Sequence, residues 1–235
     1  MKPFNDYSDI RGFCYSGGYR IPQEQLKREL GYARSLQLNS TRIWLSERDY
    51  RKDPAAFLSK LTAFVETAWE AGISTMPILF NGNGLHPGDL EQGYEEYAKN
   101  YIKDVVQALR GEPGLLMWDV MNEPSCNDYI IEAKGEERKA RWEKVNEFLR
   151  RSCDKVRKLD SVNAVTIGHT YMGDVADTVE EVDVFSFHDY LPVRRQIEES
   201  YLAAEELSAR VGKPFLNSEL CCLCRANPYD LALDI

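Results

Sequence analysis

Two glutamates in this sequence end apolar runs and could take part in bond-breaking chemistry. Glu123 lies near the end of the stretch Leu115–Pro124, and Glu219 ends the short run Lys213–Glu219. Apolar runs of this kind are typical of strands that are buried on both faces. Pro124 has no N–H and favours an extended residue before it, so we expect the first strand to end there. Each carboxylate would then lie at the C-terminal end of a buried strand.

Two carboxyl groups at strand ends suit the hydrolysis of a glycosidic bond. One protonates the leaving oxygen, and the other acts on the opposite side of the anomeric carbon. In an α/β barrel, the C-terminal ends of distant strands meet at one mouth. We therefore expect Glu123 and Glu219 to form the catalytic pair. The alternative, for either glutamate taken alone, is a solvated strand end.

Arg42 and Asn122 are candidates to support this pair. Arg42 lies in the middle of the apolar run Asn39–Leu45, and a buried arginine is almost never unpaired. Beside Glu219 it would keep that carboxylate ionised, whereas a structural ion pair elsewhere is the alternative. Asn122 precedes Glu123, and adjacent strand residues point to opposite faces. Both side chains reach the mouth only if the strand ends or bulges there, and the amide could then bind a sugar hydroxyl.

Three further side chains could line the same mouth. His188 and Tyr190 lie at the end of an expected strand and could hydrogen-bond the sugar or the nucleophile, although a core histidine is the alternative for His188. His86 follows another strand in a long polar loop and could line the cleft, with a surface histidine as the equal alternative. Catalytic metal sites gather several ligands at one point, and the scattered histidines do not. We therefore predict no metal and no cofactor.

The rest of the chain alternates strands with helices. Strands are expected at residues 10–15, 39–45, 73–80, 115–124, 163–168, 183–190 and 213–219. Helices are expected after Pro22, from Asp53-Pro54 to Ala71-Gly72, and over residues 94–109, 136–159, 172–181 (weak and short) and 194–211, with a further start at 227–230. Such alternation predicts a parallel sheet with right-handed crossovers.

The pattern predicts a single domain over residues 1–235 with an α/β fold. We expect a (β/α)8 TIM barrel that lacks its eighth βα unit, because only sixteen residues follow Glu219. The sequence is then C-terminally incomplete, or another chain supplies the last unit. An open doubly wound sheet is the main alternative, but Ser16-Gly17-Gly18-Tyr19 is not the glycine-rich dinucleotide motif.

Composition limits the partners. The 235 residues carry a formal net charge of −9, which argues against nucleic acid and against anionic membrane surfaces. No apolar run approaches the roughly 20 residues that cross a bilayer. The first residues have no apolar core of a signal peptide, so a cytoplasmic location is expected. The sequence gives no prediction of oligomeric state.

Six cysteines are present, and with no export signal they are expected to be reduced thiols. Three of them, Cys221, Cys222 and Cys224, follow Glu219 closely. Thiolates bind zinc, but the spacing is not the usual C-x2-C pair and no second pair completes a site. Structural thiols are therefore favoured over a metal site.

Four segments resemble clan A glycoside hydrolases, and most closely the cellulase and β-mannanase-like enzymes of family 5. Trp118–Pro124 resembles the acid/base motif at the end of strand four. Asn39–Leu45 resembles the strand-two segment with its arginine, and Phe187–Tyr190 resembles the strand-six segment. Lys213–Glu219 resembles the strand-seven segment that ends in the nucleophile.

The resemblance implies a retaining double displacement on β-linked oligo- or polysaccharides. Glu123 would be the acid/base and Glu219 the nucleophile, with Asn122 among the supporting residues. The family's strand-eight tryptophan has no counterpart here, and its strand-three histidine has none unless His86 serves. Two other hypotheses remain open: a non-catalytic or truncated barrel that binds carbohydrate, and an unrelated barrel enzyme such as a phosphate-binding lyase. The second is disfavoured because no glycine-rich phosphate loop follows Glu219.

Overall fold

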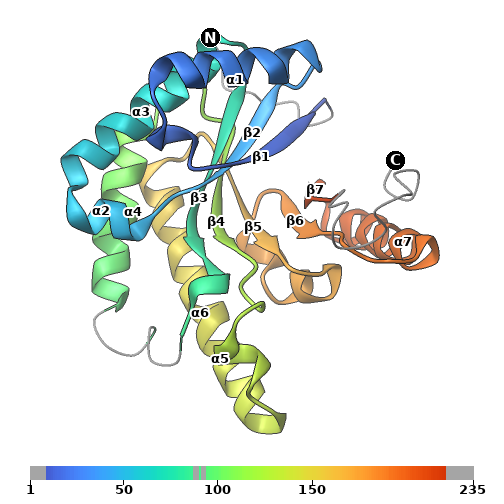
Figure 1. The fold of residues 1–235 in the computed structure, drawn as a ribbon. Helices are drawn as coiled ribbons and strands as arrows, with labels where there is room; N and C mark the ends of the chain where they lie inside the picture. The colour runs from blue at the N-terminus through green and yellow to red at the C-terminus, as the bar shows by residue number, and fades with distance from the viewer. Residues whose placement is uncertain (1–8, 87–89, 91–93, 221–235) are drawn as a thin grey trace.

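Seven parallel strands form one curled sheet in strict chain order (Figure 1). A computed structural model describes residues 9–86, 90 and 94–220. The strands are β1 Gly12–Ser16, β2 Ser40–Trp44, β3 Ser74–Asn81, β4 Met117–Asn122, β5 Ala164–His169, β6 Phe185–His188 and β7 Phe215–Glu219. A doubly wound sheet reverses its strand order at a switch point. This order never reverses, so the sheet is seven strands of a (β/α)8 barrel, as predicted.

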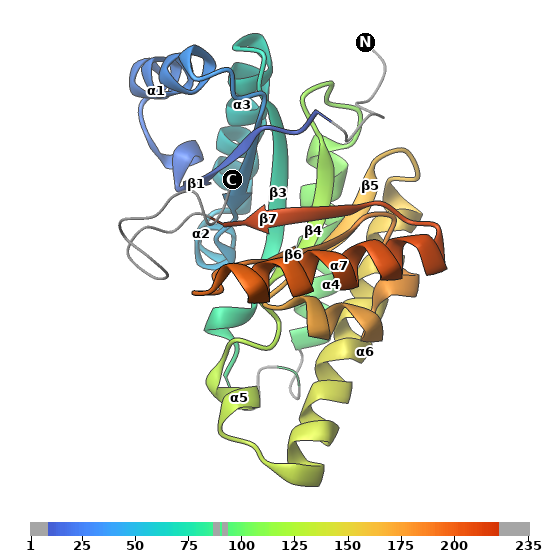
Figure 2. The ribbon, with the colours of Figure 1, turned by 90° about the vertical axis from the view of Figure 1, so that its right-hand side faces the viewer.

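The main helices follow the strands and cover the outer face of the sheet (Figures 1 and 2). They are α1 Gln23–Ser35, α3 Pro54–Glu70, α4 Tyr94–Leu109, α6 Gly135–Leu159 and α7 Arg194–Val211. Short elements complete the fold: α2 Glu47–Lys52, α5 Asp128–Ile131, η1 Gly18–Arg20, η2 Gly82–Gly84, η3 Met172–Asp177 and η4 Val179–Glu181. In the described part of the chain, no helix has both the length and the apolar character needed to cross a bilayer.

Local sequence signals account for the main helix ends. Asp53 caps α3 by accepting a hydrogen bond from Ala56 N, and Pro54 takes the first helical position, as predicted. Gly212 ends α7 with a φ of 70°, a conformation that glycine adopts without strain. Ser46 and Asn127 cap α2 and α5, two short helices that were not predicted. The weak helix expected at 172–181 is instead the pair η3 and η4, and the helix expected from 227 lies outside the described residues.

Apolar side chains fill both sides of the sheet. The large core cluster joins the outer face of the strands to the helices and includes Leu30, Phe64, Val105, Trp118 and Leu149. A small second cluster, Met76, Leu116 and Met117, lies near the N-terminal ends of the strands, with Ile10 and Leu216 against it. The C-terminal ends of the strands carry the polar residues instead.

The curl of the sheet brings its two edge strands towards each other. Within the described residues β1 pairs only with β2, and β7 only with β6. The Cys14 thiol of β1 nevertheless donates to the Ser218 carbonyl of β7, with Sγ 3.7 Å from the oxygen. A cavity of about 540 Å³ lies along this seam and reaches Arg42 and Glu219.

Candidate active site

The end of β4 presents two consecutive side chains to the same mouth. The pairing of β4 with β5 shifts register between Asp119 and Asn122, and Glu123 has a positive φ of 46°. Glu123 N donates to Gly168 O at 2.7 Å, which holds the turned backbone against β5. The chain therefore bends where the sequence required it to, and Asn122 and Glu123 both contact residues of the site.

The start of η2, directly after β3, packs closely against this bend. A Cβ atom added to Gly82 would lie 2.3 Å from Glu123 O and 2.7 Å from Asn122 O. A Cβ atom does not approach a carbonyl oxygen that closely without a shift of the backbone, so glycine is the residue that fits there. Beside it, Asn122 Nδ2 donates to Asn81 Oδ1 at 3.1 Å. The Gly82 backbone of η2 and the Asn81 side chain at the end of β3 thus fix the positions of Glu123 and Asn122.

Arg42 is the central residue of a buried charge cluster. Its Nε donates to Asp119 Oδ2 at 2.9 Å and its Nη2 to Asn122 Oδ1 at 2.9 Å, while Nη1 donates to Glu219 Oε1. Burial lowers the pKa of Arg42, and the Asp119 and Glu219 carboxylates raise it by more, so its pKa lies above the ordinary value. The guanidinium stays charged and links β2, β4 and β7.

Glu219 is held from several sides at the end of β7. Besides the bond from Arg42, Tyr190 Oη donates to Glu219 Oε2 at 2.8 Å. His188 Nε2 lies 3.7 Å from Glu219 Oε1. These contacts hold the carboxylate firmly in one orientation, with little exposed surface.

His188 stands between the two glutamates. Its Nδ1 lies 3.0 Å from Glu123 Oε1, and the imidazole is buried. One ligand-type atom from each of Glu123, His188 and Glu219 lies within 4.8 Å of the others. The two carboxyl groups therefore face each other closely, and the same three residues could in principle hold a small cation.

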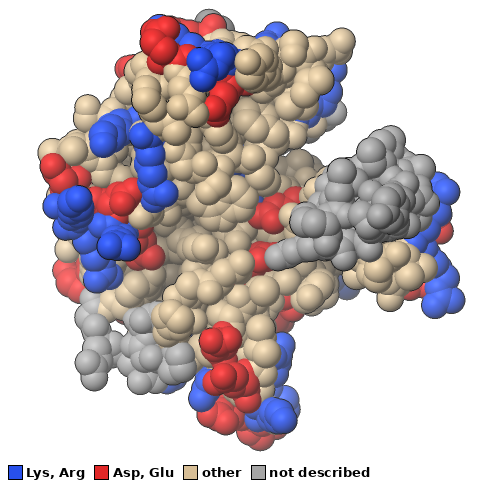
Figure 3. All heavy atoms as spheres, viewed as in Figure 1, with Lys and Arg blue, Asp and Glu red and all other residues tan. Residues whose placement is uncertain are grey.

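Six of the seven predicted site residues come together. They are Arg42, Asn122, Glu123, His188, Tyr190 and Glu219. His86 is exposed just beyond η2, next to residues outside the described ranges, and its place in the site stays a prediction. Figure 3 shows acidic side chains in a hollow near the centre of one face.

Two residues of the cluster were not predicted. Asp119 is a charge inside an apolar strand, the same signal that identified Arg42, and it is fully buried against that arginine. Asn81 carries the amide at the end of β3. Asp119 could have been found by matching the two buried charges, but nothing in the sequence distinguished Asn81 from an ordinary loop asparagine.

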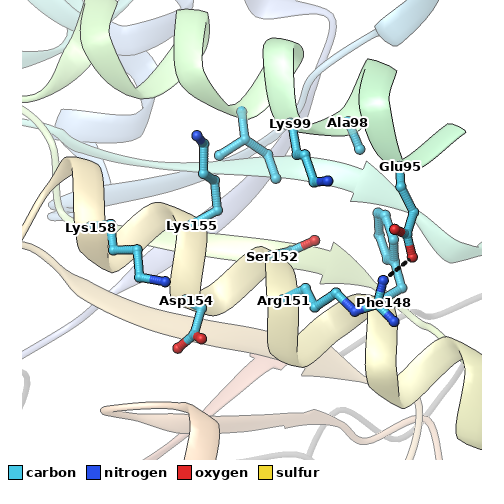
Figure 4. Close-up of a pocket in the computed structure, with 10 residues that line it drawn as sticks. Glu95, Ala98, Lys99, Phe148, Arg151, Ser152, Asp154, Lys155 and Lys158 are labelled. Carbon is cyan, nitrogen blue, oxygen red and sulfur yellow. Dashed lines mark hydrogen bonds and ion pairs between the residues drawn. The ribbon is translucent and has the colours of Figure 1, made fainter. Parts of the chain in front are cut away.

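A separate pocket lies in the outer helix layer, between α4 and α6 (Figure 4). It encloses about 330 Å³. Lys99, Lys155 and Lys158 line it, and Glu95 pairs there with Arg151. None of the cluster residues lines this pocket, so it is distinct from the candidate active site.

Comparisons with known proteins agree on one family and one fold. The family model for cellulase (glycosyl hydrolase family 5) matches residues 14–218. No curated protein sequence matches the chain. An exo-β-1,4-mannosidase from an Opitutaceae bacterium has 19% identity and a TM-score of 0.69, with 91% of this chain and 46% of that one covered. An endo-β-1,4-mannanase from Thermotoga petrophila has 16% identity and a TM-score of 0.65, with 89% and 60% covered. The chain thus spans about half the length of these two proteins.

Proposed function

Because the chain belongs to glycosyl hydrolase family 5, we propose that it hydrolyses β-linked oligo- or polysaccharides and retains the configuration of the anomeric carbon. Glu219 acts as the nucleophile and Glu123 as the acid/base. The observation that carries the proposal is the close approach of the two carboxyl groups, with oxygen atoms within 4.8 Å. Retaining enzymes separate these groups by about 5–5.5 Å, and inverting enzymes by about 6.5–9.5 Å.

The reaction proceeds in two displacements. Glu219 attacks the anomeric carbon while the bond to the leaving oxygen breaks, and Glu123 in its acid form protonates that oxygen. The product is a glycosyl ester of Glu219. Water then attacks the same carbon, gives its proton to the Glu123 carboxylate and releases Glu219. The first displacement leaves Glu123 as the carboxylate that accepts the proton of water. The second displacement restores Glu123 to its acid form and frees Glu219.

The surrounding side chains keep both acids in place. Arg42 and Tyr190 donate to the two oxygens of Glu219, so its carboxylate is oriented before substrate binds. His188 holds Glu123 in the same way. Arg42 and Asn81 fix the Asn122 amide, whose remaining N–H is available for a sugar hydroxyl.

The structural neighbours suggest which sugar to test first. Both neighbours described above act, by their titles, on β-1,4-linked mannose chains. We therefore propose β-1,4-mannosides as the first candidate substrates, with β-1,4-glucosides as the comparison.

The test is a labelling and product experiment on the full chain. A 2-deoxy-2-fluoro-β-mannosyl fluoride should form a stable ester that peptide mass spectrometry locates at Glu219. Proton NMR should detect the β-anomer as the first product. Glu219→Gln should abolish turnover, whereas Glu70→Gln, an exposed glutamate of α3, serves as the control with normal turnover.

Three outcomes would contradict the proposal. An α-anomer as first product would indicate inversion. Near-normal turnover by Glu219→Gln would remove the nucleophile assignment. Calorimetric binding of mannotetraose or cellotetraose without any product would favour the carbohydrate-binding barrel.

A further inference from the structure

The pocket between α4 and α6 has an apolar floor (Figure 4). Buried side chains form this floor: Ala98 and Ile102 from α4, and Phe148 and Ser152 from α6. Because Ala98 and Ser152 are small, the two packed helices leave a hollow between them. Phe148 contacts Phe80 of β3, with the ring centroids 5.2 Å apart, so the floor is part of the close-packed core. The hollow therefore has a firm, apolar base.

The rim of the pocket carries an excess of positive charge. Four of the six charged residues that line it are basic, although the whole chain has a net charge of −9. Glu95 and Arg151 form an ion pair at one end. Lys99, Lys155 and Lys158 form no ion pair and no hydrogen bond with any residue that the structure describes. These three ammonium groups therefore supply the uncompensated charge of the rim.

Helix chemistry accounts for one of the three lysines only. Lys158 lies in the last turn of α6, where the helix dipole favours a positive charge. Asp154 lies one turn before it and also lines the pocket, but among the described residues the two make no ion pair. Lys155 is half-buried beside the apolar floor, and Lys99 lies away from both ends of α4. Neither the dipole nor an ion pair explains why Lys99 and Lys155 lie on opposite walls of one pocket (Figure 4).

We propose that this pocket binds a small organic anion. The three lysines hold its phosphate, sulfate or carboxylate group through charge-assisted hydrogen bonds, and its apolar body lies on Phe148 and Ile102. The volume of about 330 Å³ is at the lower end of the range of about 300–1,000 Å³ for small-molecule sites, so it suits a ligand of one or two rings. The inference goes beyond the proposed function and does not depend on it, because no residue of the candidate active site lines the pocket.

Isothermal titration calorimetry on the full chain tests the proposal with 1-naphthyl phosphate, 1-naphthyl sulfate and 1-naphthoate. Each probe joins two apolar rings to one oxyanion. One molecule should bind per chain, and the tightest of the three probes identifies the preferred oxyanion. Inorganic phosphate lacks the rings and 1-naphthol lacks the charge, so each should bind at least about tenfold more weakly than that probe.

Single substitutions locate the bound probe. Lys155→Gln should weaken its binding by roughly tenfold and Lys99→Gln by about three- to tenfold, since each removes one charged donor. Lys103→Gln is the matched control, because Lys103 is an exposed lysine of the same helix α4 that does not line the pocket. This control and Glu219→Gln should both bind the probe as the parent does.

Four results would overturn the proposal. The first is that none of the three naphthyl probes binds the parent protein. The second is that 1-naphthol binds as tightly as the charged probes. The third is that Lys155→Gln and Lys99→Gln bind as the parent does, or lose no more affinity than Lys103→Gln. The fourth is loss of binding in Glu219→Gln, which would locate the probe in the active site. None of these results bears on the proposed function, which turnover tests separately.

Discussion

Arg42 and Asp119 form a buried ion pair whose two members depend on each other. Asp119 has no exposed surface, and its carboxylate accepts from Arg42 and from Gly168 N at 3.1 Å. A buried charge that loses its partner is costly, whereas an apolar pair of similar volume can be tolerated. The main effect of each charge on stability is therefore to offset the cost of burying the other, and the net gain from their attraction is smaller.

Arg42→Met should destabilise the protein by about 3–5 kcal/mol, because Asp119 would be left as an uncompensated buried charge. The double variant Arg42→Met, Asp119→Leu should lose clearly less than the sum of the two single losses. Urea denaturation followed by circular dichroism measures all three. Additive losses would show that the two side chains do not compensate each other. Both Arg42 variants should also be inactive, because Glu219 loses its charged donor and keeps the Tyr190 hydroxyl.

His169 at the end of β5 makes stability depend on pH. Burial, and to a smaller extent the neighbouring His188, lowers the pKa of His169 from 6.5 to about 3. Its Nε2 shares a hydrogen bond of 2.7 Å with Thr178 Oγ1. Between these two pKa values the unfolded chain binds a proton at this position and the folded chain does not. The contribution of neutral His169 is therefore fully present above pH 6.5 and is lost as the pH falls towards 3.

The variant His169→Gln should flatten this dependence. For the parent, the His169 contribution to the free energy of unfolding should fall by roughly 1.4 kcal/mol per pH unit in this window. Urea midpoints measured at pH 7, 6, 5 and 4 would give both slopes. Parallel slopes for parent and variant would show that other groups control the acid sensitivity.

At the scale of elements, the close packing of η2 against the end of β4 determines where Glu123 lies. Gly82→Ala places a methyl group against the Glu123 and Asn122 carbonyls, so η2 and the bend must separate. We expect a loss of kcat of at least about tenfold, because small displacements of catalytic groups are costly. Gly84→Ala, in the same short helix, meets no atom within 4 Å and should leave kcat unchanged. Equal effects of both substitutions would contradict this account.

Most elements could be predicted from sequence, and the exceptions are segments too short to show a helical period. The long helices α4 and α7 have the predicted bounds because their apolar stripes are regular. The helices α2 and α5 are too short to show a period, and they depend on the single caps Ser46 and Asn127. The connection at 172–181 has apolar residues but too few turns, and tertiary packing decides its conformation.

Site residues could be predicted where the residue type itself indicates a chemical role. They could not be predicted where the role depends on how the chain packs. Glu123, Glu219 and Arg42 were identifiable as charges in or after apolar strands. The contact of His188 with both glutamates depends on the curl of the sheet, which no local pattern reports. Gly82 became recognisable as a constraint on the site only once its distance to Glu123 was known.

At the scale of the whole molecule, the two glutamates lie at the ends of strands that differ in burial and in the number of strands that pair with them. β4 is entirely buried and lies between β3 and β5, whereas β7 is half-buried and pairs, within the described residues, with β6 alone. Amide hydrogen exchange followed by mass spectrometry should therefore find the longest protection in β3 and β4 and earlier exchange in β7. Protection of β7 equal to that of β4 would show that the sheet opens only as a unit.

Glu123 occupies a backbone conformation that disfavours its own residue type. Its positive φ costs a non-glycine residue about 1–2 kcal/mol. The variant Glu123→Gly should therefore melt at a higher temperature than Glu123→Ala, which keeps the strain, while both lack the acid. Natural selection for stability alone would replace this glutamate. If catalysis were no longer required, substitution of Glu123 by glycine would be expected to gain stability, and the melting comparison measures how large that gain is.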